Sequence, residues 1–157
     1  MLINPEILNS ELINKTFIEK IYYFNEIDST NEYAKKIKDE DNILIVSEYQ
    51  TSGRGRFNRI WESEKGKNLT FTIKKKFNLE NKYLQIVNFY FIYFLLDAVE
   101  KFIIDNLNLR PDLEIKWPND ILLSGKKLCG LLIESNQKNF YVGIGLNVNQ
   151  EKFNPEY

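Results

Sequence analysis

The sequence predicts an α+β fold in which a mixed, largely antiparallel sheet is flanked by helices. The last third of the chain contains strand-like segments joined by short turns, which indicates an antiparallel meander. The helical segments precede this meander instead of alternating with it, as they would in a parallel α/β fold. The length of 157 residues suits a single core, and 43% of the residues are hydrophobic.

The first half of the chain combines short strands with a capped helix. Unbroken apolar runs predict strands at Ile21–Phe24 and Ile43–Val46. Threonines that alternate with apolar residues predict a third strand at Leu69–Ile73. The segment Asp28-Ser29-Thr30 supplies capping side chains for a helix over Glu32–Ile37.

The second half begins with a long helix and continues with the meander. Apolar residues surround the whole of Tyr83–Ile104, so we expect this helix to be mostly buried. Glu114–Trp117 and Asp120–Leu123 are expected to form one strand, bent at Pro118-Asn119, and the proline implies a sheet edge or a bulge. The following turns and strands of the meander are Ser124-Gly125, Lys127–Glu134, Asn136–Asn139 and Phe140–Val148.

The composition excludes several kinds of catalytic site. The chain has no histidine and one cysteine, Cys129, which excludes Ser-His-Asp catalysis, histidine-ligated metals and an internal disulfide. Cys129 stands among apolar residues, where we expect a core residue and not a nucleophile. The available lysine, arginine, carboxylate, tyrosine, amide and backbone groups suit a reaction on phosphate.

Charge and hydropathy also limit the partners. A net charge of −1 gives no general attraction to nucleic acid or to an anionic membrane. The start of the chain lacks a signal-peptide pattern, and the most apolar stretch, Ile86–Leu96, is too short and interrupted to span a bilayer. We therefore expect a soluble cytoplasmic protein. Lys74-Lys75-Lys76 is expected to be a solvated strand end.

The loop Gln50–Arg59, which contains Gly53-Arg54-Gly55-Arg56, is the strongest candidate for a binding site. Its glycines let backbone amides approach a ligand, and three arginines within six residues match phosphate or carboxylate oxygens. The spacing differs from a P-loop, because no Gly-Lys-Ser/Thr follows. The loop predicts an anion site, although a solvated basic turn explains the same pattern about as well.

The predicted last strand has one apolar face and one face that contains two glycines. The apolar face carries Phe140, Val142, Ile144, Leu146 and Val148, and the opposite face carries Tyr141, Gly143, Gly145, Asn147 and Asn149. Glycines weaken a strand unless something must approach its backbone. A bound ligand and the close packing of another element explain these glycines equally well.

Two further groups of residues have both a structural and a functional interpretation. Asp120 and Lys127 flank a turn that places them on adjacent strands. They could form an ordinary surface pair, or Asp120 could bind a metal ion while Lys127 neutralises a phosphate. Taken alone, the surface pair is the better explanation. Ser29-Thr30-Asn31 caps a helix, and it also offers hydroxyls and amides to a small polar ligand. Trp61 fits a core or lid position better than a cofactor contact.

Taken together, these segments resemble the biotin–protein ligase family, the biotin–[acetyl-CoA-carboxylase] ligases. The matching stretches occur in the family's order, and they are Asp28–Asn31, Glu48–Trp61, Lys116–Asp120, Lys127–Gly130 and Gly143–Asn149. The resemblance implies a class II synthetase-like catalytic fold and a two-step reaction. Biotin and MgATP first give biotinyl-5′-AMP and pyrophosphate. The adenylate then acylates one lysine of a biotin carboxyl carrier protein or domain of a biotin-dependent carboxylase or decarboxylase.

The resemblance implies that one end of the site binds biotin. Ser29, Thr30 and Gln50 would hydrogen-bond the ureido head of biotin, with Asn31 adjoining them. Gly130 would let biotin lie against its strand. Biotin is mostly apolar with two polar ends, which fits an apolar trough with few donors.

The other end would bind the nucleotide and carry the chemistry. The residues implied to be catalytic are Lys127, Arg56 and Asp120. Lys127 would lie between the biotin carboxylate and the α-phosphate. Asp120 would help to place Mg²⁺ or Lys127. The other residues implied to bind the nucleotide or the adenylate are Gly53, Arg54, Gly55, Trp61, Asn119 and Asn147.

The chain also departs from the family pattern. Asn58 stands where the family usually has glycine, which raises the question of how this loop closes. Residues 1–20 form a weakly patterned lead-in that is too short for the DNA-binding domain of the repressor members, so no nucleic-acid partner is expected. We take 21–157 as the catalytic domain. The chain ends at Tyr157, where the family continues with a small C-terminal domain, and we therefore expect a truncated chain.

Other functions remain open at this point. A lipoate or octanoate ligase or transferase has a related fold, although the absence of histidine does not match the pattern expected for those families. A non-catalytic biotin- or nucleotide-binding fragment is the second alternative. Exposed strand edges also leave a homodimer open.

Overall fold

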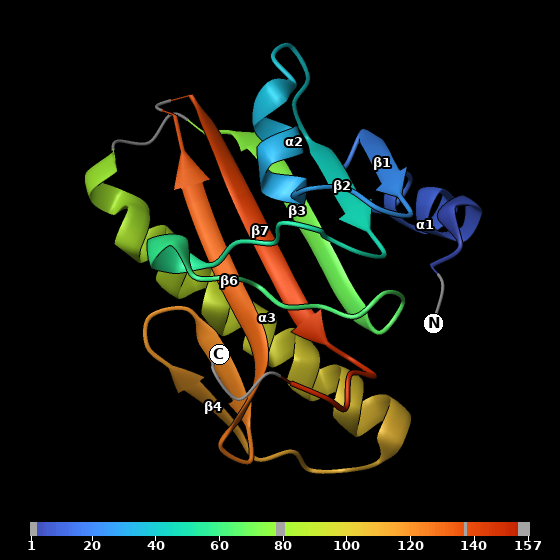
Figure 1. Cartoon of the computed structure of the whole chain (residues 1–157), viewed down its shortest axis with the longest axis vertical. Helices are drawn as coiled ribbons and strands as arrows, with labels where there is room; N and C mark the ends of the chain where they lie inside the picture. The colour runs from blue at the N-terminus through green and yellow to red at the C-terminus, as the bar shows by residue number, and fades with distance from the viewer. Residues whose placement is uncertain (1–2, 78–80, 137, 154–157) are drawn as a thin grey trace.

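The strands form a single mixed sheet in the part of the chain that the structure, a computed structural model, describes: residues 3–77, 81–136 and 138–153 (Figure 1). The strand order is β1-β2-β3-β7-β6-β5-β4. The bounds are β1 Lys20–Phe24, β2 Ile43–Ser47, β3 Asn68–Lys76, β4 Leu113–Lys116, β5 Asp120–Leu123, β6 Lys126–Ser135 and β7 Asn139–Asn147. Only β1 and β2 pair in parallel, and all other neighbours are antiparallel. The predicted mixed, largely antiparallel sheet is confirmed.

Three α-helices accompany this sheet in the described residues: α1 Pro5–Leu12, α2 Thr30–Lys36 and α3 Leu84–Leu107. The 3-10 turns η1 Arg56–Asn58 and η2 Asn81–Tyr83 lie between them. Ser29 caps α2, because its hydroxyl accepts a hydrogen bond from the backbone N–H of Glu32, as the sequence predicts. None of the helices in the described residues is long and apolar enough to cross a membrane.

The two faces of the sheet are covered by different helices, because side chains alternate along each strand. Val142 and Ile144 of β7 belong to the cluster that contains Ile92 of α3. On the opposite face, Tyr141 packs in a cluster with Ala34 of α2. Figure 1 shows α3 behind the sheet, with α2 and the loop after β2 in front. The front face is therefore only partly covered by helix.

The lead-in contains the helix α1, which packs on the sheet. Asn4 caps it by accepting hydrogen bonds from the backbone N–H groups of Glu6 and Ile7. Leu8 and Leu12 pack against the cluster of Ile18, Leu44 and Val46, the last two from β2. The weak amphipathic pattern of these residues therefore corresponds to a short helix with one covered side.

The expected bent strand at Pro118-Asn119 is wrong. β4 and β5 are separate strands that pair antiparallel, with Lys116 opposite Asp120. The chain therefore reverses completely between them. Pro118 itself lies in the turn between β4 and β5 and on neither strand, so the expectation of a proline on an edge strand or bulge is wrong as well. A register shift also interrupts the pairing of β5 with β6 between Ile121 and Leu122.

The expectation that the long helix is mostly buried is also wrong. Ile92 is the one fully buried residue of α3, whereas Phe89, Tyr90, Tyr93 and Phe94 are exposed. The sheet covers one side of the helix, and apolar residues continue around the other side. High apolar content alone does not show which side of a helix is covered.

Lys74 corrects the expectation of a solvated strand end. Its side chain is fully buried, and its Nζ donates a hydrogen bond to the backbone carbonyl of Ile37 at 2.7 Å. Lys74 belongs to the same strand face as Thr70 and Thr72, which lies toward α2. Burial, with a smaller contribution from Lys76, lowers the pKa of Lys74 below its usual value of 10.5. Lys74 thus holds the end of α2.

Candidate active site

A cavity of about 930 Å³ lies where α2, the loop after β2, the β4–β5–β6 hairpins and β7 meet. Thirteen of the predicted site residues line it: Ser29, Thr30, Asn31, Gln50, Arg54, Gly55, Arg56, Trp61, Asn119, Asp120, Lys127, Gly130 and Asn147. The structure therefore brings together residues that are spread over 119 positions of the sequence, from Ser29 to Asn147.

Gly53 is the predicted site residue that lies behind the lining. It is buried, and its carbonyl accepts a hydrogen bond from the backbone N–H of Trp61 at 2.9 Å. A Cβ at this position would be 2.6 Å from the carbonyl oxygen of Trp61, so only glycine fits this packing. Gly53 thus supports Trp61, and its role in nucleotide binding stays a prediction.

The start of α2 forms one polar end of the cavity. The backbone N–H and the hydroxyl of Thr30 lie 2.8 and 3.0 Å from Oε1 of Gln50. Ser29 and Thr30 are both 3% exposed, and both line the cavity. The helix-cap and ligand-binding interpretations of Ser29-Thr30-Asn31 are therefore compatible.

Asn31 is fixed by contacts on both sides of its amide. Its Nδ2 donates to Oε2 of Glu134 at 3.0 Å and to the carbonyl of Leu132 at 3.4 Å. Its Oδ1 accepts from the hydroxyl of Thr72 at 2.5 Å. A Cβ on Gly143 would be 2.5 Å from Asn31 Oδ1, so this glycine makes room for the Asn31 side chain.

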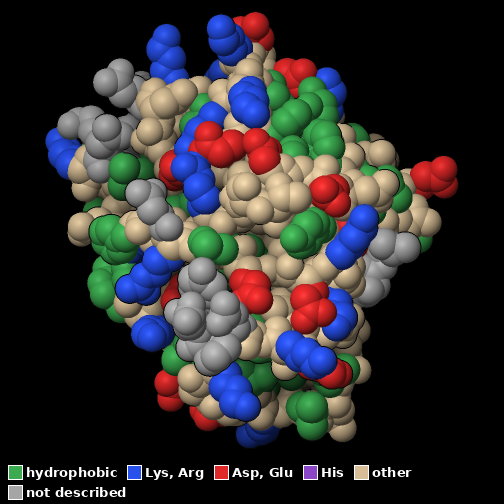
Figure 2. Space-filling model, viewed as in Figure 1, with side chains coloured by type: hydrophobic (Ala, Val, Ile, Leu, Met, Phe, Trp, Pro, Cys, Tyr) green, Lys and Arg blue, Asp and Glu red, His purple; other side chains and the backbone are tan. Residues whose placement is uncertain are grey.

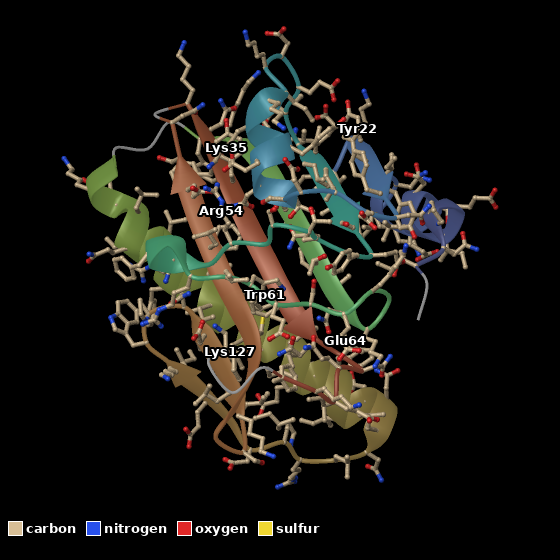
Figure 3. The ribbon with its side chains drawn as sticks, viewed as in Figure 1. Tyr22, Lys35, Arg54, Trp61, Glu64 and Lys127 are labelled. Carbon is tan, nitrogen blue, oxygen red and sulfur yellow. The ribbon has the colours of Figure 1, made fainter. Side chains whose placement is uncertain are left out.

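A charged cluster that the sequence patterns did not indicate lies beside Asn31. Lys35 Nζ bonds to Oε1 of Glu134 and to Oε1 of Glu32, each at 2.8 Å. The Arg54 guanidinium forms an ion pair with the same Glu32 carboxylate. In Figure 2, acidic and basic side chains lie next to one another on the face that carries α2, and Figure 3 shows Lys35 and Arg54 close together there. The i, i+3 spacing of Glu32 and Lys35 was the available signal.

Glu134 is ionised by its surroundings. Burial alone raises the pKa of Glu134, but hydrogen bonds from Lys35 and Asn31 outweigh burial and hold this pKa below its usual value of 4.5. A carboxylate can only accept hydrogen bonds. Glu134 therefore presents two acceptor oxygens to α2.

The arginine-rich loop forms a small hairpin over the cavity. The backbone N–H of Gly55 donates to the carbonyl of Arg59 at 2.7 Å, and the backbones of Arg54 and Ile60 form an isolated antiparallel β-bridge. The Arg56 guanidinium lies 5.2 Å from the ring centroid of Phe57. The side chain of Asn58 lies outside the described part of the structure, so the expectation about this residue stays open.

Asp120 and Lys127 form the other polar end. Lys127 Nζ lies 3.0 Å from Asp120 Oδ1, with side chains 46% and 19% exposed respectively. The carboxylate is thus too buried for an ordinary surface pair. Lys127 Nζ also lies 5.6 Å from the ring centroid of Trp61. Figure 3 shows Arg54, Trp61 and Lys127 in sequence along the front of the sheet.

Trp61 lies directly on the glycines of two neighbouring strands. A Cβ on Gly145 would be 2.3 Å from Trp61 Cε2, and one on Gly130 would be 3.0 Å from Trp61 Cζ3. Gly130 and Gly145 are paired residues of β6 and β7. Close packing of another element therefore explains the glycine face of β7, and the same residues line the cavity.

Trp61 Nε1 and Asn147 Oδ1 are buried polar atoms of the site with no hydrogen-bond partner among the described residues, and Asp120 Oδ1 likewise has no hydrogen bond there besides its ion pair with Lys127. A donor and an acceptor in this state are suited to a polar ligand that satisfies both. The side-chain amide Nδ2 of Asn147 donates to the carbonyl of Lys127 at 3.1 Å, and Nδ2 of Asn119 donates to the carbonyl of Leu131 at 2.9 Å. Asn119 and Asn147 thus also hold the hairpin in place.

The described residues contain no group of three or more Asp, Glu, His or Cys side chains that could hold a metal ion. Asp120 offers one carboxylate at the cavity. Mg²⁺ is commonly held by one or two carboxylates together with substrate phosphates. The site therefore fits Mg²⁺ that arrives with a nucleotide, and does not form a complete metal cage. Cys129 is fully buried, and burial raises its pKa to about 12, which confirms a core residue.

Comparison with known proteins identifies the class. Residues 23–150 match the Biotin/lipoate A/B protein ligase family. This match covers most of the chain, and the chain belongs to that family.

Individual relatives are biotin ligases. The chain is 31% identical over 144 residues to the bifunctional ligase/repressor BirA of Bacillus spizizenii. This alignment covers 85% of this chain and 42% of that protein. It is 31% identical over 125 residues to the biotin–[acetyl-CoA-carboxylase] ligase of Mycobacterium tuberculosis, covering 75% of this chain and 44% of that protein. The biotin protein ligase from Aquifex aeolicus in complex with biotin and ATP superimposes with a TM-score of 0.69 at 31% identity, over 88% of this chain and 56% of that one. The chain thus spans less than half the length of these curated relatives.

Proposed function

We propose that this protein is an ATP-dependent ligase that activates biotin as biotinyl-5′-AMP and transfers it to a lysine of a biotin carboxyl carrier protein. One observation carries this proposal. A single cavity has a hydrogen-bonding end at Thr30 and Gln50, a cationic end at Lys127, and the apolar Trp61 ring among its walls. Biotin has the same order of groups, with a polar ureido head, an apolar chain and a carboxylate. Similarity to the Aquifex aeolicus complex with biotin and ATP supports the same substrates.

In the first step, a carboxylate oxygen of biotin attacks the α-phosphorus of ATP. A P–O bond forms, the bond to the β-phosphate oxygen breaks, and pyrophosphate leaves with the bonding electron pair. Lys127 lies at the cationic end, where its ammonium stabilises the charge that develops on the α-phosphate oxygens. Asp120 orients this ammonium at 3.0 Å. Mg²⁺, when bound with ATP, supplies neutralisation of the phosphate charge.

In the second step, the amine of the carrier lysine attacks the carbonyl carbon of the adenylate. An amide C–N bond forms, the C–O bond to the phosphate breaks, AMP leaves, and the amine proton goes to solvent. The adenylate has to be retained between the two steps. Arg54 and Arg56 line the same cavity and lie on the loop hairpin, where they are suited to hold the adenylate phosphate.

The deciding experiment is biotin-dependent ATP–pyrophosphate exchange, with lipoate as the competing substrate. We expect exchange with biotin and little with lipoate, because lipoate has no ureido group to satisfy Thr30 and Gln50. Exchange with lipoate alone would show a lipoate ligase. Binding of biotin without any exchange would show a non-catalytic binding fragment. A second assay follows biotin transfer to a purified carrier domain, with the acceptor lysine changed to arginine as the control.

A further inference from the structure

A chain of buried polar contacts leads from β6 through α2 and β3 to the biotin-head end of the cavity. It passes from Glu134 to Asn31, then to Thr72, and ends at Thr30. Asn31, Thr72 and Thr30 are 3%, 0% and 3% exposed, so most of their polar contacts are made within the protein. The direction of each hydrogen bond in this chain therefore has to be settled by the protein itself.

We infer that Glu134 sets the hydrogen-bond polarity of the site through Asn31 and Thr72, so that Thr30 presents an acceptor to a ligand N–H group. This inference rests on the proposed function, because it assigns that N–H to the ureido head of biotin. It makes Glu134 and Thr72 positioning residues that decide which head group the site accepts.

The first step is the orientation of Asn31. The Glu134 carboxylate and the Leu132 carbonyl are both acceptors, and they lie 3.0 and 3.4 Å from Asn31 Nδ2. A reversed amide would place Oδ1 against these two oxygens. Lys35 bonds to the other oxygen of Glu134 at 2.8 Å and keeps the carboxylate charged. Asn31 Oδ1 therefore has to face Thr72.

The second step is the single proton of Thr72. Its hydroxyl lies 2.5 Å from Asn31 Oδ1, which can only accept, so Thr72 donates there. The Thr72 oxygen then has only lone pairs left for Thr30, whose hydroxyl oxygen is 2.8 Å away. Thr72 thus becomes an acceptor toward Thr30.

The third step is the proton of Thr30. Its protein neighbours are the Thr72 oxygen at 2.8 Å and Gln50 Oε1 at 3.0 Å, and both are acceptors. Gln50 Oε1 also accepts the backbone N–H of Thr30 at 2.8 Å, which fixes the orientation of the Gln50 amide. The Thr30 proton therefore stays within the protein. A ligand therefore meets lone pairs on the Thr30 oxygen and the N–H donors of Gln50 Nε2. The lone pairs complement the N–H groups of a ureido ring, and the Gln50 donors complement its C=O group.

The main test is Glu134→Gln, which keeps the size of the side chain and removes its obligatory acceptor character. We expect the Kd for biotin, measured by calorimetry, to rise about tenfold or more, because a polar contact in the site is then mismatched. The KM for ATP should stay within about twofold. Glu40→Gln is the matched control, since Glu40 also accepts from a lysine and a neutral side chain, Lys20 and Tyr22, outside the cavity lining.

A double variant separates polarity from mere packing. In Glu134→Gln with Asn31→Asp, the side-chain NH2 of the glutamine donates to one aspartate oxygen, and the second aspartate oxygen still accepts from Thr72. The first oxygen then faces the Leu132 carbonyl, which lies 3.4 Å from Asn31 Nδ2, so the recovery should be partial. We expect this double variant to bind biotin more tightly than Glu134→Gln alone. Tighter binding by the double variant supports the inference, and if Glu134→Gln weakens biotin and ATP equally, the polarity inference is wrong.

Thr72 provides a second route if the Glu134 variants do not fold. Thr72→Ser keeps the hydroxyl, and Thr72→Val keeps the shape without it. We expect near-normal biotin binding for serine and a loss of about tenfold for valine. Equal binding by the two variants overturns the inference. A wild-type chain that binds no biotin would instead refute the proposed function, so the two failures are distinguishable.

Discussion

Replacement of Gly145 by alanine tests the contact between Trp61 and the sheet. The added Cβ would be 2.3 Å from Trp61 Cε2, whereas carbon atoms pack at about 3.5–4.0 Å, so the ring has to move by more than about 1 Å. Trp61 is restrained by its backbone bond to the Gly53 carbonyl at 2.9 Å. We expect Gly145→Ala to lower the free energy of unfolding by about 1–3 kcal/mol, as overpacking usually does.

Urea unfolding followed by far-UV circular dichroism measures this loss. Gly55→Ala is the control for stability, because its Cβ would be 3.6 Å from the carbonyl oxygen of Arg59, an ordinary van der Waals contact. Its φ of −107° suits alanine, so we expect a change of less than about 1 kcal/mol. If Gly145→Ala is as stable as the control, Trp61 does not rest on Gly145 and the described packing of the site is refuted.

Four further predictions follow from the site and the core. Lys127→Ala should slow adenylate formation about 10²–10³-fold with a much smaller effect on the Kd for biotin, as pre-steady-state and calorimetric measurements would show. Arg56→Gly should release free biotinyl-AMP, and unchanged retention of the adenylate on a desalting column would contradict the lid role. Lys74→Met should change the free energy of unfolding at pH 7 by less than about 2 kcal/mol, because the loss of the hydrogen bond to the Ile37 carbonyl offsets the relief of burying an ammonium group. Wild-type stability should rise as pH rises through the lowered pKa of Lys74 toward 10.5, and Lys74→Met should lack this rise in urea titrations at several pH values. The folded-state pKa of Glu134 is lowered from 4.5, so the ionised carboxylate stabilises the fold. The difference in free energy of unfolding between wild type and Glu134→Gln should therefore reach its full value above pH 4.5 and shrink below it. A difference that grows on acidification would contradict the ionised carboxylate.

Much of the fold followed from local patterns that the structure preserves. The strand at Ile43–Val46, the capped helix after Ser29 and the tight turn at Ser124-Gly125 each depend on neighbouring residues alone. The errors arose where the result depends on distant partners. The burial of α3 depends on what covers its second side, and the burial of Lys74 depends on an acceptor, the Ile37 carbonyl, that lies on another element.

The site was predictable to a similar degree. The basic loop and the Asp120–Lys127 pair stood out because arginines, glycines and a turn are visible in the sequence. Thr72 and Glu134 did not stand out, since each has an ordinary place in an alternating strand. Their importance comes only from contacts that join β3, β6 and α2, with Asn31 between them.

The position of Trp61 has a practical consequence for every ligand experiment. The chain contains two tryptophans, Trp61 and Trp117, and both line the cavity. Intrinsic fluorescence excited at the red edge of tyrosine absorption therefore originates from the site alone, with no signal from elsewhere in the chain. The ammonium of Lys127 lies 5.6 Å from the Trp61 ring, so any ligand that displaces either group changes the local field at the indole. The protein thus carries its own optical probe, and a Trp117→Phe variant would isolate the emission of Trp61.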